Sequence, residues 1–486
     1  MSFRPFIQRL QPRRRALVLG AVYFTGVALL IYAGFSGWAY DDPFITYRYA
    51  RNLAAGLGFV YNPGEAVLST TTPLFALLLT IPARLGLDLP AAANAIGAAS
   101  LAAGALLLWG LAQRWQTPIV GWAALVLYPA SPLLLRTLSS ETPLYIALCL
   151  GAILCYARQG YTGAGALAAL AMLSRPDGGL VAALLAAHFV LFVRRPWPWR
   201  ALGVFLALTL PWFMFAWYYF GSPAPLTLLA KQQQGAMSIS RGFLPAFFDL
   251  LAGYGKLWNY QAQAVLALGG AVYLAWRRRA WGLFLTWTVA YFAAYTILGV
   301  SSYYWYYAPL APGWIALVGL GLDGLWAGAR RRLPAGSQGL AWVLPGVLLL
   351  ALGAAQVGDA LRLQQLPDRR VDLYRQVGVW INANTPPDAS LGLLEAGIGV
   401  SYADRRIIDF AGLFQPELSA RLGELDNYNA AARWAVTQYQ PDWLVLQAGM
   451  FGDLPQLYPN QACMHVKTVL GADYDYPLDL EIYRCQ

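Results

Sequence analysis

Long apolar stretches recur along the first 357 residues and are separated by short polar segments. An apolar helix of about 20 residues is long enough to cross a hydrocarbon core of about 30 Å. We therefore predict eleven membrane-spanning helices, near residues 16–35, 91–112, 118–135, 142–157, 162–174, 178–193, 201–219, 259–276, 281–299, 307–326 and 338–357. The pattern is typical of a polytopic α-helical membrane protein.

The arginines of this region predict its orientation. They precede the first span and then fall in alternate loops, at Arg4, Arg9, Arg13, Arg14, Arg15, Arg114, Arg158, Arg194, Arg195, Arg200, Arg277, Arg278, Arg279, Arg330, Arg331 and Arg332. Because short cytoplasmic loops are enriched in Lys and Arg, we expect a cytoplasmic N-terminus and, after an odd number of spans, a C-terminal segment outside the plasma membrane. A cleaved signal peptide over residues 1–35 is the alternative, but no A-x-A pattern ends the apolar run, so we expect a retained helix.

The composition changes near residue 358, where Pro, Asp, Asn and Gln become frequent. Runs of strand length remain near 390–394, 443–447, 465–470 and 480–484, and helical patterns cover 371–384 and 428–438. We therefore predict two domains, a membrane domain over 1–357 and an extracytoplasmic α/β domain over 358–486.

The four cysteines fall into two pairs. Cys463 opens one strand-like run and Cys485 closes another, so an antiparallel pair would place them opposite each other. Outside the cytosol they could form a disulfide; two free thiols are the alternative. Cys149 and Cys155 lie within a predicted span, where we expect them to be packing residues.

Composition and charge exclude several classes of function. The chain is 58% hydrophobic and only 12% charged, which is too little charge for the surface of a soluble globule of 486 residues. The net charge of +10 comes from the membrane domain, which holds 24 Lys and Arg against 8 Asp and Glu. With no basic stripe or nucleic-acid motif, we do not expect a nucleic-acid partner. Two histidines make a His-rich zinc site improbable.

The candidate chemistry lies on the outer side. Seven of the eight acidic residues before residue 358 fall there, and three of them, Asp41, Asp42 and Glu141, adjoin apolar runs, where proton affinity can be perturbed. Residues 36–90 form the first outer loop. Its segments 43–53 and 72–87 have amphipathic patterns, and we expect them to be helices on the outer membrane surface.

Several motifs resemble those of a known superfamily. Asp41-Asp42-Pro43-Phe44-Ile45-Thr46-Tyr47-Arg48-Tyr49-Ala50-Arg51-Asn52, followed by Gly56 to Glu65, resembles the first-loop signature of GT-C membrane glycosyltransferases. Among these, the bacterial terminal arabinofuranosyltransferases are the most similar, and aminoarabinose transferases and protein O-mannosyltransferases are more distant. Further matches lie at 140–144, 174–178, 219–223 continuing to Lys231, and 409–413. The resemblance covers nearly the whole chain and implies a GT-C fold.

The resemblance also implies roles for the acidic residues. Asp41 would be the catalytic base, Asp42 its neighbour, and Glu141 the acid of the second outer loop. A carboxylate can accept the proton of an acceptor hydroxyl as it attacks the anomeric carbon, and a single displacement inverts that carbon; a double displacement is the alternative. The same three residues could instead hold Mg²⁺, Mn²⁺ or Ca²⁺. The resemblance implies no other cofactor.

The implied donor is a sugar on polyprenyl phosphate, so cations are expected near its phosphate. The candidates are Lys231, Arg48, Arg51 and Arg175, with Arg136 and Arg241 as further possibilities; for the arginines, the alternative role is to reach lipid headgroups. In the aromatic cluster 301–307, Tyr304 and Tyr307 are candidate substrate-binding residues. Interfacial aromatic residues of a membrane protein are the competing explanation for them.

The resemblance therefore implies an inverting glycosyltransferase of the cell envelope, a hexosyl- or pentosyltransferase in the plasma membrane. Its acceptor would be an extracytoplasmic glycan, lipid or protein. Two other functions stay open. One is a transporter or flippase of lipid-linked sugars, although the spans hold few of the ionisable groups that would line its path. The other is a catalytically inactive assembly protein of the cell envelope.

Overall fold

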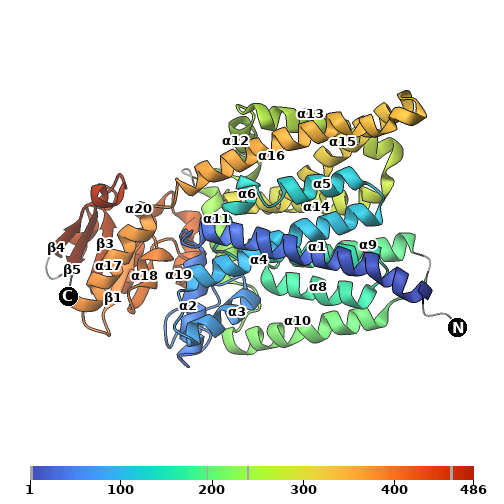
Figure 1. The fold of residues 1–486 in the computed structure, drawn as a ribbon. Helices are drawn as coiled ribbons and strands as arrows, with labels where there is room; N and C mark the ends of the chain where they lie inside the picture. Colours follow the sequence, from blue (N-terminus) through green and yellow to red (C-terminus); the bar gives the residue numbers. More distant parts are fainter. Residues whose placement is uncertain (1–3, 194, 238–239, 460–462, 486) are drawn as a thin grey trace.

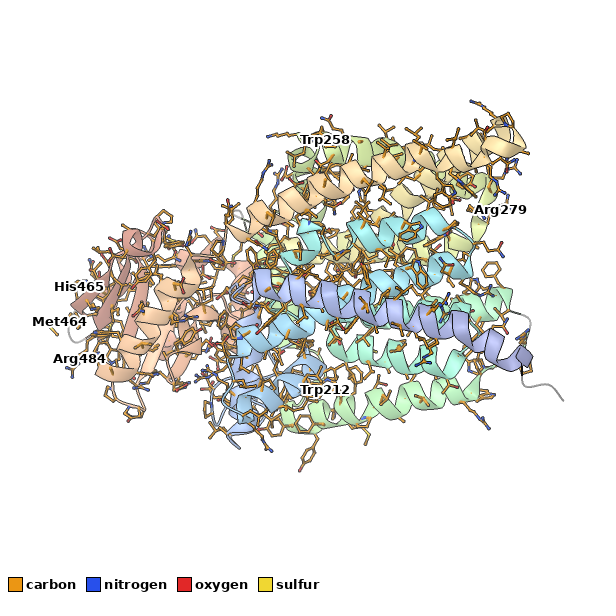
Figure 2. All side chains as sticks on the ribbon, in the orientation of Figure 1. Trp212, Trp258, Arg279, Met464, His465 and Arg484 are labelled. Carbon is orange, nitrogen blue, oxygen red and sulfur yellow. A yellow bond between two sulfur atoms is a disulfide. The ribbon has the colours of Figure 1, made fainter. Side chains whose placement is uncertain are left out.

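The computed structural model describes residues 4–193, 195–237, 240–459 and 463–485. A bundle of helices carries a small domain with a β-sheet at one end, and the N-terminus lies at the opposite end (Figure 1). Arg279, one of the arginines predicted to be cytoplasmic, lies at the end of the bundle near the N-terminus (Figure 2).

Helices occupy every range predicted to span the membrane. They are α1 (Arg4–Phe35), α4 (Leu89–Arg114), α5 (Pro118–Leu127) with α6 (Pro132–Leu135), α7 (Thr142–Ala157), α8 (Tyr161–Ser174), α9 (Gly178–Phe192), α10 (Trp199–Phe220), α13 (Trp258–Arg277), α14 (Gly282–Leu298), α15 (Ala311–Arg332) and α16 (Val343–Gln364). Among the described residues, six helical segments are long and apolar enough to cross a membrane, and α5, α7, α8 and α9 are shorter apolar helices. α16 continues past residue 357, so the predicted domain boundary falls inside this helix.

The third predicted span is not one continuous helix. α5 ends at Leu127 and α6 begins at Pro132, with Tyr128 to Ser131 between them. Proline lacks the N–H that a helix interior requires, and it disfavours helical backbone at the residue before it. Pro129 and Pro132 therefore interrupt the apolar run that the hydropathy pattern joins.

The helices of the bundle differ in how much of their apolar surface is buried, as is typical of a protein surrounded by lipid. The apolar windows of α4 and α15 are 61% buried, whereas those of α1 and α10 are 6% and 11% buried. Because lipid is as apolar as leucine, a membrane bundle can leave apolar side chains exposed at its periphery. α4 and α15 thus form the centre of the bundle, and α1 and α10 lie at its surface.

The first outer loop contains α2 (Pro43–Ala54) and α3 (Pro73–Arg84). Nine of the twelve residues of α2 are buried, so the predicted position of this helix on the membrane surface is wrong. Its polar side chains are paired with other parts of the protein, which removes the need for water on that face. α3 does expose apolar residues, including Leu77 and Ile81.

Two further helices lie outside the predicted spans. α11 (Leu226–Ala236) follows α10, and α12 (Phe243–Tyr254) precedes α13. α11 packs against α19 (Pro416–Arg421) of the C-terminal domain and lies where the bundle meets that domain (Figure 1).

The C-terminal domain is α/β, as predicted. Its five-stranded sheet has the order β2-β1-β3-β5-β4, in which β1 is parallel to β2 and β3, and β5 is antiparallel to β3 and β4. The strands are β1 (Ser390–Leu393), β2 (Arg406–Asp409), β3 (Trp443–Gln447), β4 (Met464–Val469) and β5 (Leu480–Arg484), and the helices are α17 (Arg370–Asn384), α18 (Ile398–Ser401), α19 (Pro416–Arg421) and α20 (Tyr428–Tyr439). The sequence pattern missed β2, α18 and α19, which are only four to six residues long.

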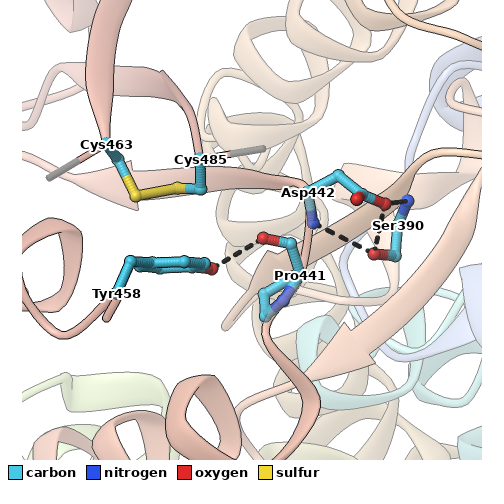
Figure 3. The surroundings of a disulfide bond; sticks show 6 residues. All are labelled: Ser390, Pro441, Asp442, Tyr458, Cys463 and Cys485. Carbon is cyan, nitrogen blue, oxygen red and sulfur yellow. Dashed lines mark hydrogen bonds between the residues drawn. A yellow bond between two sulfur atoms is a disulfide. The ribbon is translucent and has the colours of Figure 1, made fainter. Parts of the chain in front are cut away.

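Cys463 and Cys485 are joined by a disulfide at the ends of β4 and β5 (Figure 3). These strands are antiparallel, and Met464 is paired with Arg484, so the two cysteines continue the register of the ladder. Cys149 is buried and Cys155 is half-buried; neither is in a disulfide.

We expect peptide mapping of the native, unreduced protein to recover Cys463 and Cys485 in one cross-linked fragment. Replacing both with serine removes a cross-link between residues 22 apart in sequence and is expected to lower the free energy of unfolding of this domain by about 3 kcal/mol, because the unfolded chain gains freedom. Thermal unfolding with and without reductant measures the effect. Two alkylatable thiols in the native protein would contradict the cross-link.

Candidate active site

Asp41 and Asp42 lie where the first span meets the first outer loop. Pro43 occupies the first turn of α2, where its missing N–H costs no hydrogen bond. The N–H groups of Phe44 and Ile45 donate to the carbonyl oxygens of Asp41 and Asp42 at 3.0 and 3.1 Å. Both acidic residues therefore stand at a helix N-terminus, where the helix dipole favours negative charge.

Asp42 pairs with Lys231 of α11. Lys231 Nζ lies 3.5 Å from Asp42 Oδ2 and 3.9 Å from the ring centre of Tyr303, and its side chain is only 10% exposed. Burial lowers the pKa of Lys231, but the charge of Asp42 and the nearby tyrosines outweigh this effect, so the pKa lies above its usual range. Lys231 is therefore a buried cation at neutral pH.

Glu141 belongs to a second charged cluster, between α6 and α9. Arg175 Nη1 lies 3.4 Å from Glu141 Oε1, and Arg175 Nη2 lies 3.1 Å from Asp177 Oδ2. Tyr295 of α14 accepts a hydrogen bond from Arg175 at 2.7 Å and donates one to Asp177 at 2.9 Å. Burial raises the pKa of Glu141, although the charge of Arg175 opposes the shift. The cluster holds the guanidinium group in one orientation.

Two cavities meet at the Asp42–Lys231 pair. The first, which we call the apolar cavity, has a volume of about 600 Å³ and is lined by apolar residues that include Leu180, Trp212, Phe213, Leu228 and Leu298, together with the charged residues Asp42, Glu141, Arg175, Asp177 and Lys231. Trp212 projects from α10 beside the first outer loop (Figure 2). A cavity with apolar walls and cations at one end suits an amphiphilic anion.

The second, which we call the charged cavity, has a volume of about 570 Å³ and lies between the bundle and the C-terminal domain. Its lining includes Asp41, Asp42, Arg136, Lys231, Asp368, Arg370, Glu395, Tyr303, Tyr304 and Tyr428. The two cavities share Tyr40, Asp42, Lys231, Trp305 and Leu413. Such a polar, aromatic lining suits a hydroxyl-rich molecule, and the shared residues mark where two ligands would meet.

Asp41 lines the charged cavity and is otherwise enclosed. The N–H of Ile398 donates to Asp41 Oδ1 at 2.8 Å. Burial is the main reason why the pKa of Asp41 lies well above its usual range, and the negative charge of Glu395 adds to the shift. A carboxyl group with raised proton affinity is better matched to accept a proton near neutral pH than an ordinary aspartate.

The matched motif at 409–413 shapes the junction of the cavities. Asp409 is buried at the end of β2 and accepts hydrogen bonds from the N–H groups of Ala411 and Leu413; burial raises its pKa to about 7. Gly412 has φ +73°, and a Cβ there would approach Leu422 at 2.8 Å. The bent loop brings Leu413 into both cavities.

Arg48 and Arg51 do not line either cavity as the described residues define them, so the structure does not bring them together with Lys231 and Arg175. Arg48 Nη1 lies 3.1 Å from Asp404 Oδ1 and 3.3 Å from the carbonyl oxygen of Ala403. Arg51 reaches Ser401 at 3.5 Å. Both arginines therefore attach α2 to the C-terminal domain.

The remaining candidates divide in the same way. Tyr304 lines the charged cavity, where its ring lies 4.7 Å from the guanidinium carbon of Arg136. Tyr307 instead points into the bundle, and its hydroxyl donates to the carbonyl oxygen of Phe243 at 2.8 Å, so the structure does not place it beside Tyr304 in the charged cavity. Arg241 pairs with Asp249, and both side chains are more than half exposed.

The expected metal ligands do not come together. Among the described residues, no group of three or more His, Cys, Asp and Glu side chains is arranged to hold a metal ion. Asp42 is paired with Lys231, and Glu141 with Arg175. The set Asp41, Asp42 and Glu141 therefore does not fit Mg²⁺, Mn²⁺ or Ca²⁺, which prefer several oxygen ligands around one point.

The residues that border the two cavities and that sequence reasoning missed include Asp177, Tyr295, Arg370, Glu395 and Tyr428. A local signal existed for Asp177, which follows Arg175 by two residues in a matched motif. No such signal marks Arg370 or Glu395, because both come from the C-terminal domain and reach the cavity only through its docking on the bundle.

Sequence comparisons find two similarities. A family described as a domain of unknown function, DUF8728, matches residues 361–479. The terminal beta-(1->2)-arabinofuranosyltransferase of Mycobacterium tuberculosis is 30% identical over 223 residues, which are 41% of this chain and 35% of that protein. The chain thus matches about a third of the length of this relative.

Solved structures match a much larger part of the chain. ArnT from Cupriavidus metallidurans, bound to undecaprenyl phosphate, aligns with a TM-score of 0.64 at 15% identity over 96% of this chain and 98% of its own. The oligosaccharyltransferase from Archaeoglobus fulgidus, tethered to an acceptor peptide, aligns with a TM-score of 0.57 at 12% identity over 88% and 69%. The chain therefore shares the fold of these two proteins, a helical bundle with a small sheet domain at its end.

Proposed function

We propose that this protein is an inverting glycosyltransferase that moves one sugar from a polyprenyl-phosphate donor to an extracytoplasmic acceptor. The observation that carries the proposal is the meeting of an apolar and a charged cavity at Asp42 and Lys231, with Asp41 in the charged one. A lipid-linked donor and its acceptor need separate routes to one point, and two cavities that share Asp42 and Lys231 support this arrangement.

The apolar cavity is assigned to the donor. Its apolar walls suit a polyprenyl chain, and Lys231 and Arg175 provide charge-assisted hydrogen bonds for the phosphate. Undecaprenyl phosphate, the molecule bound to the related ArnT structure, has this chemistry. Arg48 and Arg51 take no part, since they attach α2 to the C-terminal domain.

The charged cavity is assigned to the acceptor and to proton transfer. The acceptor hydroxyl oxygen attacks the anomeric carbon and forms the new glycosidic bond. The bond between that carbon and the phosphate oxygen breaks, and its electron pair stays on the phosphate beside Lys231. The hydroxyl proton passes to Asp41. The products are the glycoside, polyprenyl phosphate and protonated Asp41, and the single displacement inverts the anomeric carbon.

We expect the purified protein, reconstituted in vesicles with labelled polyprenyl-phosphate pentoses and hexoses, to release polyprenyl phosphate. Candidate glycan, lipid and peptide acceptors are offered in parallel, and mass spectrometry follows both products. NMR of the glycoside reports its anomeric configuration, which is expected to be opposite to that of the donor.

Two outcomes would overturn the proposal. Movement of intact lipid-linked sugar between leaflets, without release of polyprenyl phosphate from any donor, identifies a transporter. Neither release nor translocation across the panel, with a folded protein, indicates a non-catalytic assembly protein. Retention of the anomeric configuration would overturn the inverting mechanism while leaving the transferase assignment intact.

The orientation is part of the proposal. We infer a plasma-membrane protein with a cytoplasmic N-terminus and an extracytoplasmic C-terminal domain, because Arg279 lies at the N-terminal end of the bundle and both cavities adjoin the opposite end.

A further inference from the structure

The carboxylate of Asp41 is held by the C-terminal domain, although Asp41 itself belongs to the membrane domain. The N–H of Ile398, at the start of α18, donates to Asp41 Oδ1 at 2.8 Å. A Cβ on Gly397 would lie 2.3 Å from the carbonyl oxygen of Asp41 and 2.6 Å from Oδ1. Only glycine therefore allows these two segments, more than 350 residues apart in sequence, to approach so closely.

The first outer loop fixes this segment of the C-terminal domain on both sides. The hydroxyl of Tyr61 donates to the carbonyl oxygen of Ala396, directly before Gly397. Arg48 donates to the carbonyl oxygens of Ala403 and Arg405 at 3.3 and 3.2 Å, beyond the end of α18. The position of Ile398 against Asp41 is thus set by several contacts.

Two residues of opposite charge lie in the same cavity as Asp41. Glu395 and Arg370 both line the charged cavity, and Arg370 Nη1 lies 3.0 Å from Glu395 Oε1. Arg370 also pairs with Asp368, at 2.6 Å. The Glu395 side chain is 19% exposed and that of Arg370 is 29% exposed, so solvent screens their charges only in part.

We propose that Gly397, Glu395 and Arg370 are positioning residues of the transfer reaction: they orient Asp41 toward the acceptor cavity and control its charge. This inference rests on the proposed function and deepens it, because it makes the C-terminal domain part of the base site. None of the three residues needs to touch the substrate. The bundle alone would then hold an incomplete catalytic site.

The charged neighbours of Asp41 act on it in known directions. Burial raises its pKa most, the negative charges of Glu395 and Asp42 raise it further, and the positive charge of Arg370 lowers it. The phenols of Tyr61 and Tyr374 also face it. A base works only when ionised, so transfer is expected to fall as the pH drops through this raised pKa.

The test is the pH dependence of kcat/KM for three full-length proteins: the wild type, Glu395→Gln and Arg370→Gln. The acidic limb of the profile is the pH range in which kcat/KM falls because Asp41 becomes protonated. Removing the negative charge of Glu395 lowers the pKa of Asp41 and is expected to move this limb to lower pH. Removing the positive charge of Arg370 raises that pKa and is expected to move the limb to higher pH, each shift being about 0.5 to 1 pH unit. A purely structural role would lower rates without shifting the limb in opposite directions. Arg370→Lys keeps the charge and is expected to leave the limb near that of the wild type.

The controls isolate the effect. Arg433→Gln breaks an ion pair with Asp453 elsewhere in the C-terminal domain and is expected to leave the pH profile unchanged. Gly397→Ala is expected to lower kcat/KM at least tenfold, whereas Gly452→Ala, where a Cβ would meet nothing within 4 Å, is expected to have no effect. Circular dichroism and thermal unfolding show whether each variant is folded.

Limbs that coincide for wild type, Glu395→Gln and Arg370→Gln would overturn the inference while the transferase assignment stands. Shifts in one common direction would also overturn it. If one glutamine variant fails to fold, the other still decides, because its direction of shift is specified. If the wild type transfers no sugar from any donor in the panel, the proposed function fails first.

Discussion

Replacing Asp41 with asparagine is expected to reduce sugar transfer by about 10²-fold or more, because the amide keeps the size of the side chain but cannot accept the proton of the acceptor hydroxyl. Asp41 is half-buried and lines the charged cavity, and the N–H of Ile398 that contacts Oδ1 can also donate to an amide oxygen. The fold is therefore expected to survive the change. Initial rates with a labelled donor, at matched protein amounts, measure the effect.

Asp42→Asn provides an internal comparison and is expected to reduce sugar transfer less than Asp41→Asn does. Asp42 is paired with Lys231 and contributes to the electrostatic field of the site rather than accepting the proton. Asp88→Asn is the matched surface control, because this exposed residue only caps α4 through the N–H of Ala91. Transfer near the wild-type rate by a folded Asp41→Asn protein would exclude Asp41 as the base. A larger loss in Asp42→Asn than in Asp41→Asn would reassign that role to Asp42.

Replacing Lys231 with alanine is expected to lower turnover by about 10- to 100-fold, the range of a lost hydrogen bond to a charged group. Negative charge grows on the departing phosphate as its bond to the sugar breaks, so the ammonium group stabilises the transition state more than the bound donor. Turnover is therefore expected to fall more than donor affinity. Steady-state kinetics and direct binding of the lipid-linked donor separate the two effects.

Lys231→Arg is expected to restore part of the activity, because the charge remains while its geometry changes. Arg241→Ala is the control, since Arg241 is also a cation near the outer end of the bundle but pairs with Asp249 at the exposed surface. A Lys231→Ala protein that binds donor tenfold more weakly at unchanged turnover would show that Lys231 only recruits the donor.

Local sequence identified those parts of the site that are close together in the chain. Asp41 and Asp42 were identified because they end an apolar run and begin a matched motif, and Lys231 because it is one of few lysines and follows another match. The same reasoning named Arg48 and Arg51, which the structure does not bring to the cavities. Both arginines lie in the same motif as Asp41 and are therefore close to it in the chain. In the folded protein, however, their side chains contact the C-terminal domain.

Tyr304 and Tyr307 show the same limit on a smaller scale. They are three residues apart in one aromatic cluster, yet Tyr304 borders the charged cavity and the hydroxyl of Tyr307 contacts the carbonyl oxygen of Phe243 inside the bundle. The sequence of an aromatic cluster does not distinguish these positions, because the direction of each side chain depends on the local backbone conformation. The residues 304–306 form a short 3₁₀ helix, which the sequence pattern did not predict.

By itself, the sequence determined the helical membrane bundle, the α/β character of the C-terminal domain and the identity of Asp41 and Asp42 as candidate acidic residues. These features depend on the length of apolar runs, on local periodicity and on residues adjacent in the chain. Only the tertiary structure decided that α2 is buried, that Asp42 meets Lys231, that Gly397 packs against Asp41, and that Glu395 and Arg370 line the same cavity as Asp41. Those contacts join segments that are far apart in the chain, most of them by hundreds of residues. Their geometry depends on how the segments and the two domains pack against each other, and local sequence patterns do not predict this packing.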